Sequence, residues 1–139
     1  MDDELYQEQI LDHYQHPRNK KVLKDATFQH HEHNPSCGDD LTIYVKIKKN
    51  QTLQVAFQGH GCAISQASAS LLAEYLNNKS LSELIILPQE KIFQLLGIPI
   101  SNNRTKCALL CYLTIRQGLQ EYQHKNQTKG EYHAKIRNQ

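Results

Sequence analysis

The chain has 139 residues, with 16 Lys and Arg against 14 Asp and Glu, which gives a formal net charge of +2. This length suits one domain with a single core, and so small a charge imbalance gives no electrostatic case for a nucleic-acid partner. The first residues lack the basic and apolar regions of a signal peptide, and no apolar run approaches the roughly 20 residues of a membrane span. We therefore expect a soluble, cytoplasmic protein without a membrane partner, whose cysteines are reduced.

The hydrophobic pattern predicts a helix and then a β-hairpin in the first half of the chain. Apolar residues at helical spacing predict a helix over residues 2–16, which Pro17 ends. Residues 19–36 are expected to be irregular or weakly extended. Strict alternation of apolar and polar residues over 41–48, and again over 52–58, predicts two antiparallel strands with one solvated face.

Helical patterns dominate the second half. They predict helices over residues 62–77, 89–96 and about 103–123, and a capping box formed by Ser80 and Glu83 begins a further short helix. Because strands come first and helices later, we predict an α+β domain with helices packed on one face of a small antiparallel sheet.

The whole chain is assigned to one domain and a tail. We expect residues 1–124 to form the single domain. Residues 125–139 are polar and are expected to form a mobile C-terminal tail.

A thiol and a carboxylate stand close together before the predicted hairpin. Cys37 and Asp39 flank Gly38, whose conformational freedom lets both side chains point to one centre. Thiolates and carboxylates are both zinc ligands. The alternative is an ordinary turn with a partly exposed cysteine.

Two further cysteines stand at the starts of predicted helices. Cys62 follows a glycine-containing turn at a helix N-terminus, where the helix dipole favours a thiolate. Cys107 follows Arg104 and Lys106, whose positive charges also favour a thiolate. The alternative for Cys62 is a small buried residue at a strand–helix turn. The alternative for Cys107 is a half-buried cysteine beside solvated basic residues.

Other sulfur and nitrogen donors are present. Cys111 could add a fourth sulfur ligand, although a cysteine among leucines is typically a small hydrophobic residue. Nitrogen ligands could come from His60 and from His30, His31 and His33, which otherwise are surface or hydrogen-bonding residues.

Motifs of one known family follow each other in the correct order along the chain, between about residues 5 and 121. They are Leu5-Tyr6 with Asp12-His13-Tyr14-x-x-Pro17-Arg18-Asn19, Asn34-Pro35-x-Cys37-Gly38-Asp39, Phe57-x-Gly59-x-Gly61-Cys62-Ala63-Ile64-Ser65-x-Ala67-Ser68, and Arg104-x-Lys106-Cys107. With them the sequence resembles the U-type iron–sulfur cluster assembly proteins, IscU and SufU, which have a SufE/NifU-like fold.

The resemblance implies a single site formed by Cys37, Asp39, Cys62 and Cys107. Family members bind zinc there and, transiently, a [2Fe–2S] cluster. They accept sulfur from a cysteine desulfurase of the SufS or IscS kind and serve apo-acceptors or downstream cluster carriers. Of the site thiols, we expect Cys37 to receive the sulfur as a persulfide, with Cys107 as the second choice.

The resemblance leaves two roles open. A SufU-like protein is a zinc-dependent sulfurtransferase, whereas an IscU-like protein is a non-enzymatic cluster scaffold. The Gly59–Ser65 stretch and the Lys106-Cys107 pair look SufU-like, but the segment between Cys62 and Cys107 is too short for the insertion typical of SufU.

The same residues leave two rival functions open. One is a structural zinc domain that only binds partners. The other is a cysteine hydrolase in which Cys62 is the nucleophile and His60 the base. The hydrolase is disfavoured because neighbouring residues at a turn seldom place a base against a nucleophile, and no third orienting group is apparent.

Overall fold

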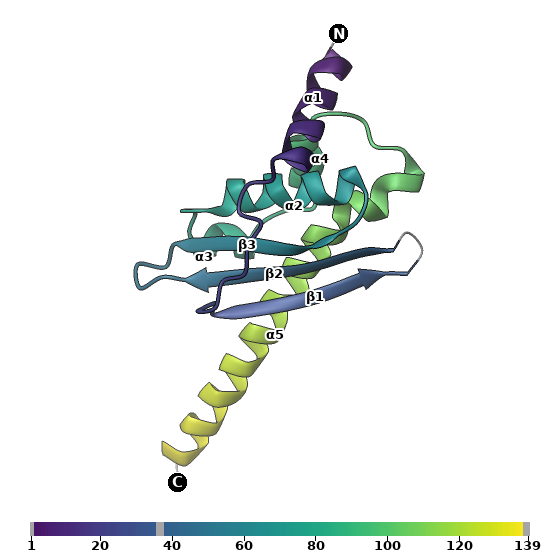
Figure 1. Cartoon of the computed structure of the whole chain (residues 1–139). Coiled ribbons are helices and arrows are strands. Elements are labelled where there is room, and N and C mark those ends of the chain that lie inside the picture. Colours follow the sequence, from purple (N-terminus) through teal and green to yellow (C-terminus); the bar gives the residue numbers. More distant parts are fainter. Residues whose placement is uncertain (1, 36–37, 138–139) are drawn as a thin grey trace.

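The structure is a computed structural model that describes residues 2–35 and 38–137, with side chains described for 8–35 and 38–126. One antiparallel sheet has the strand order β1-β2-β3, formed by β1 (Phe28–Asn34), β2 (Asp39–Ile47) and β3 (Leu53–His60). The helical elements are α1 (Asp2–Gln15), α2 (Ala63–Leu76), α3 (Leu81–Ile85), α4 (Glu90–Leu96), the 3₁₀ turn η1 (Asn102–Arg104) and α5 (Thr105–Arg137). Figure 1 shows α2 and α5 on one face of the sheet, with α5 crossing behind the strands, which confirms the predicted α+β fold.

Alternation of apolar residues explains how β2 and β3 pair. Six apolar residues of the two strands share the face that packs against the helices, and each is at most 3% exposed: Leu41, Ile43, Val45, Leu53, Val55 and Phe57. The hairpin predicted over 41–48 and 52–58 is therefore confirmed. Because β2 begins two residues before the predicted strand, Asp39 lies on the same face as Leu41 and is fully buried.

Residues 19–36 were expected to be irregular or weakly extended, but Phe28–Asn34 within them form the regular strand β1. This strand pairs with β2 so that His30 lies opposite Ile43 and Glu32 opposite Leu41. Its side chains alternate between half-buried and exposed, but only one of its residues, Phe28, is apolar. Polar side chains carry the alternation, and a pattern based on hydrophobicity could not detect it.

The outer face of the sheet is less solvated than predicted. The chain between α1 and β1 runs across this face (Figure 1), where Leu23 packs against Tyr44 and Ala56 in a small second core. Asn19 anchors the start of this segment, because its carbonyl accepts a hydrogen bond of 3.0 Å from the backbone N–H of Phe57. The part of this face near the β1–β2 loop stays open, with His31 and His33 exposed.

Two predicted helix boundaries are confirmed and one is wrong. Ser80 and Glu83 form the expected capping box, and Gly97 ends α4 in the left-handed conformation, with φ of 75°. The last helix was expected to end near residue 123 but continues to Arg137. Polar helix-forming residues extend it beyond the apolar stripe on which the prediction depended. None of the helices in the described part of the chain is long and apolar enough to cross a membrane.

Because His13 is buried, we expect acid to weaken the fold. His13, at the end of α1, is 4% exposed, and its Nδ1 lies 2.8 Å from Ser70 Oγ, which also accepts a hydrogen bond from the Arg18 backbone N–H. Burial, together with the positive charge of Arg18, lowers the pKa of His13, although Glu74 and Asp12 act in the opposite direction. The unfolded chain therefore takes up this proton first, so the His13 contribution to stability is lost as pH falls through about 6.5.

The contribution of His30 to stability should depend on pH in the opposite direction to that of His13. Burial disfavours its charged form, but the Glu32 carboxylate, 2.7 Å away, and Glu121, 3.5 Å away, outweigh burial and raise the pKa of His30. Its stabilising contribution is present below about pH 6.5 and is lost as pH rises through the folded-state value. We expect urea unfolding at about pH 5.5 and 7.5 to show a smaller acid loss for His13→Gln than for wild type, and a larger loss for His30→Gln. Identical pH responses of the two variants would contradict both assignments.

Candidate metal centre

Three of the four predicted ligands meet at one end of the sheet. A carboxylate oxygen of Asp39 and the sulfur atoms of Cys62 and Cys107 all lie within 4.8 Å of one another. Ligand atoms around a tetrahedral zinc ion are about 3.3–3.8 Å apart, so small side-chain movements would bring these three atoms to coordination distance. The fourth predicted ligand, Cys37, lies outside the described residues.

The backbone at the start of α2 holds the Asp39 carboxylate. Oδ1 accepts a hydrogen bond of 2.8 Å from the Cys62 backbone N–H, and Oδ2 lies 3.8 Å from Cys62 Sγ. Gly61 lies directly against this carboxylate, because a Cβ at that position would be 2.3 Å from Oδ1. The strand therefore supplies the carboxylate, and a glycine leaves the room that it needs.

The Cys62 sulfur caps α2. Sγ accepts a hydrogen bond of 3.4 Å from the backbone N–H of Ser65, and Ser65 Oγ donates to the Cys62 carbonyl at 3.1 Å. A side chain in this position faces the positive end of the helix dipole, which favours a negative charge. Cys62 is exposed, whereas Cys107 in the first turn of α5 is only 7% exposed.

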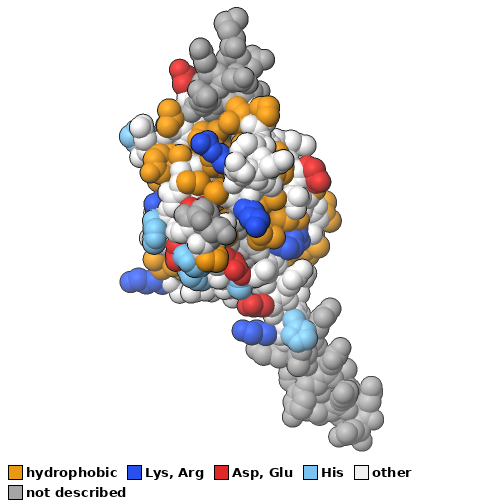
Figure 2. Space-filling view, turned by 90° about the vertical axis from the view of Figure 1, so that its right-hand side faces the viewer, with side chains coloured by type: hydrophobic (Ala, Val, Ile, Leu, Met, Phe, Trp, Pro, Cys, Tyr) orange, Lys and Arg blue, Asp and Glu red, His pale blue; other side chains and the backbone are white. Residues whose placement is uncertain are grey.

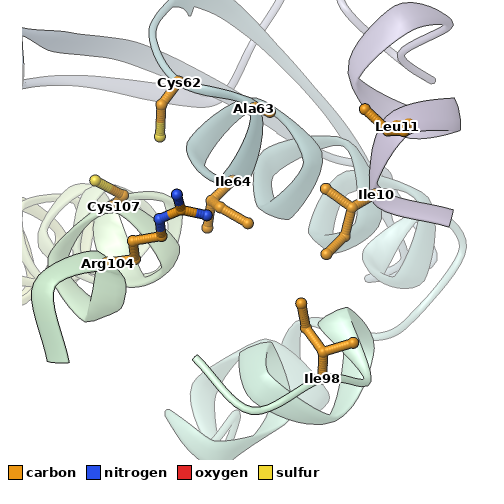
Figure 3. A pocket seen from close by; sticks show the side chains of 8 residues that line it. All are labelled: Ile10, Leu11, Cys62, Ala63, Ile64, Ile98, Arg104 and Cys107. Carbon is orange, nitrogen blue, oxygen red and sulfur yellow. The ribbon is translucent and has the colours of Figure 1, made fainter. Parts of the chain in front are cut away.

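A cavity of about 440 Å³ adjoins the two sulfur atoms. Figure 3 shows Cys62, Cys107 and the guanidinium of Arg104 on one side, and apolar side chains from α1, α2 and the segment after α4 on the others. Arg104 thus lies beside the thiols, as its place in the sequence suggested, while Lys106 is exposed. The sequence contained no signal for the apolar walls, Ile10, Leu11, Ala63, Ile64 and Ile98, because they come from three separate segments.

Cys111 lies in the core rather than with the three candidate ligands. It is fully buried, and its Sγ lies 3.7 Å from the carbonyl of Ala108. Burial raises the pKa of the Cys111 thiol to about 12. The structure supports the interpretation of Cys111 as a small hydrophobic residue.

Cys111 should consequently be inert in the folded, metal-free protein. Alkylation requires a thiolate that the reagent can reach, so we expect iodoacetamide to modify Cys62 well before Cys111. Mass spectrometry before and after urea unfolding measures the order of modification. Cys111→Ala should leave bound zinc unchanged, whereas Cys107→Ala, which removes a thiol one turn earlier on α5, should reduce it. Rapid native labelling of Cys111, or zinc loss in Cys111→Ala, would contradict the assignment.

The histidines predicted as alternative ligands lie elsewhere. His30 contacts Glu32 on its own strand and faces α5, where it contacts Gln117 and Glu121. Strand register places His33 and His60 on either side of Asp40, and His31 lies 2.9 Å from Asp40 Oδ1. Asp40 points away from the face that Asp39 occupies, because consecutive strand residues point to opposite faces.

Comparison with known proteins gives the family. Residues 5–129 match the model of the NifU-like N-terminal domain. The chain belongs to this family. It is 31% identical over 122 residues to the iron–sulfur cluster assembly scaffold protein IscU 1 of Archaeoglobus fulgidus, covering 88% of this chain and 79% of that protein.

Two further similarities are to proteins named SufU, at the same level of identity as the IscU match. The zinc-dependent sulfurtransferase SufU of Bacillus subtilis is 32% identical over 136 residues, covering 84% of this chain and 90% of that protein. The crystal structure of FiSufU from Fervidobacterium islandicum has a TM-score of 0.65 and 28% identity, covering 81% of this chain and 94% of that one. The family predicted from the sequence motifs is thus confirmed.

Proposed function

We propose that this member of the NifU-like N-terminal family is an iron–sulfur cluster assembly protein. It binds zinc or a nascent [2Fe–2S] cluster and accepts sulfur from a cysteine desulfurase in the cytoplasm. The observation that carries the proposal is the convergence of Asp39, Cys62 and Cys107 within 4.8 Å, in a chain whose relatives are named cluster assembly scaffolds and a zinc-dependent sulfurtransferase.

The donor set supports zinc as the resident ion. One carboxylate and two thiols, with Cys37 as the proposed third thiol, give the four oxygen and sulfur ligands that zinc accepts in a tetrahedron. Bound zinc would keep the thiols deprotonated at neutral pH. The described ligands come from the start of β2, the start of α2 and the first turn of α5, so the site lies where separate segments meet at one end of the domain.

Sulfur transfer needs one thiol to leave this set. We propose that the Cys37 thiolate attacks the terminal sulfur of the desulfurase persulfide; the donor S–S bond breaks, and the desulfurase cysteine leaves as a thiolate. Cys107 is the second choice. The cavity beside Cys62 and Cys107 supports access for a donor, since it opens next to the sulfur atoms and has the Arg104 guanidinium on its rim. Apo-acceptors or cluster carriers would then receive the product.

A sulfur-transfer assay tests the proposal and separates the two roles. The zinc-loaded chain is incubated with a purified cysteine desulfurase and cysteine, with and without ferrous iron. A sulfurtransferase increases alanine production without iron, whereas a scaffold develops a stable visible chromophore with iron. Cys62→Ser should lose either response and Cys111→Ala should retain it. Neither response in wild type would refute the proposal.

Metal removal distinguishes the proposal from a structural zinc domain. The main core contains buried residues from α1, all of the later helices and the β2–β3 hairpin, and most of them lie away from the ligands. We therefore expect chelation to leave helical circular dichroism and a cooperative thermal transition. A structural zinc domain would unfold when the metal is removed.

A further inference from the structure

The outer face of the sheet carries a group of histidine and carboxylate side chains apart from the candidate metal centre. His31 and His33 are two residues apart on β1, so both project from the same face, and the side chains of both are 52% exposed. The register places Asp40 directly opposite His33 on one side and His60 on the other. In Figure 2, histidine side chains gather beside acidic ones on the left of the view.

The two imidazoles of β1 flank the Asp40 carboxylate. His31 Nε2 lies 2.9 Å from Oδ1, and His33 Nδ1 lies 4.0 Å from Oδ2. Neighbouring ligands of a first-row cation, at metal–ligand distances of about 2.0–2.2 Å, are roughly 3–3.5 Å apart. The spacing of His31 Nε2 and Asp40 Oδ1 is already close to this value, and rotation of the exposed His33 side chain would bring its nitrogen closer to the same carboxylate.

The chemistry of this group differs from that of the thiolate centre. Two imidazoles and a carboxylate form an oxygen and nitrogen set that suits divalent iron, zinc, cobalt or nickel, and it lacks the thiolates that hold a cation tightly. Asp39 and Asp40 are consecutive, but they face opposite sides of β2, so the two sites are separated by the sheet. Because the His31 and His33 side chains are exposed and that of Asp40 is half-buried, water could fill the remaining positions and a bound ion could exchange.

We propose that His31, His33 and Asp40, with His60 opposite Asp40 on β3, form a second, exchangeable site for a divalent first-row transition cation. The site does not depend on the proposed sulfur transfer. It requires only the β1 register and the exposed side chains, which the three-stranded sheet supplies.

Zinc titration of the zinc-loaded protein tests this site directly. Isothermal titration calorimetry should detect one further equivalent that binds more weakly than the first. A His31→Gln/His33→Gln variant should bind the further equivalent more than about tenfold more weakly, since even partners outside the coordination shell change metal affinity by 10–100-fold. The first equivalent should be unchanged, which separates failure of this proposal from failure of the thiolate centre.

A matched control and a second readout make the result specific. His16→Gln removes one exposed imidazole near the end of α1 and should leave the further equivalent unchanged. In wild type, imidazole NMR signals of His31 and His33 should shift on addition of the second zinc, and the His16 signals should not. Absence of the further equivalent, its retention in the double variant, or shifts confined to other histidines would overturn the proposal.

Discussion

Replacement of Gly61 by alanine is expected to weaken zinc binding by about 10–100-fold although it removes no ligand. The new Cβ would lie 2.3 Å from Asp39 Oδ1 and 2.7 Å from Ser65 Oγ, both far inside van der Waals contact. The Asp39 carboxylate must move, and its hydrogen bond to the Cys62 backbone N–H moves with it. One methyl group therefore disturbs one candidate ligand, Asp39, and the backbone of a second, Cys62.

Gly118→Ala is the matched control for this substitution. Gly118 lies where α5 crosses β1, and a Cβ there would be 2.9 Å from His30 Cβ and 3.2 Å from Phe28 Cδ2. We expect this overpacking to lower the free energy of unfolding by about 1–3 kcal/mol and to leave zinc affinity unchanged. Competition with a chromophoric chelator measures affinity, and urea unfolding of the metal-free proteins measures stability. Equal losses of affinity in the two variants would show that general destabilisation, rather than displacement of Asp39, causes the effect.

The apolar elements of the fold could be predicted because burial imposes a period on the sequence. Alternation over β2 and β3 and the helical spacing of α2 both report residues that contact the core. β1 escaped prediction because half-buried polar side chains face α5 along most of its length. The C-terminal end of α5 could not be predicted for the opposite reason, because its helical backbone continues after its apolar contacts end.

The candidate site could be predicted only as residue types near junctions. The motifs indicated Asp39, Cys62 and Cys107, but no local pattern reports that three distant segments bring them within 4.8 Å. One usable signal was present. Asp39 is two and four residues from Leu41 and Ile43, so the alternation of the strand places it on the core face. Asp40 falls between these residues and therefore on the outer face. The apolar cavity had no such signal, because tertiary packing alone assembles its walls.

Asp39 has two separable functions, and two substitutions should separate them. It supplies an anionic oxygen to the candidate centre, and its Oδ1 accepts the hydrogen bond of the Cys62 backbone N–H. Asp39→Asn keeps a carbonyl oxygen for that hydrogen bond but removes the charge. We expect this variant to fold with nearly wild-type stability when metal-free and to bind zinc more than about 100-fold more weakly, beyond the range of an outer-shell partner.

Asp39→Ala should lose both functions. The Cys62 backbone N–H then lacks its acceptor beside the fully buried position of residue 39, which costs about 1–3 kcal/mol in the metal-free state. Zinc competition should therefore give equally low affinities for Asp39→Asn and Asp39→Ala. Urea unfolding of the metal-free proteins should show that Asp39→Asn is more stable than Asp39→Ala. Wild-type zinc affinity in both variants would remove Asp39 from the ligand set. Equal stability losses in both would show that the carboxylate charge, and not its hydrogen bond to Cys62, orders the start of α2.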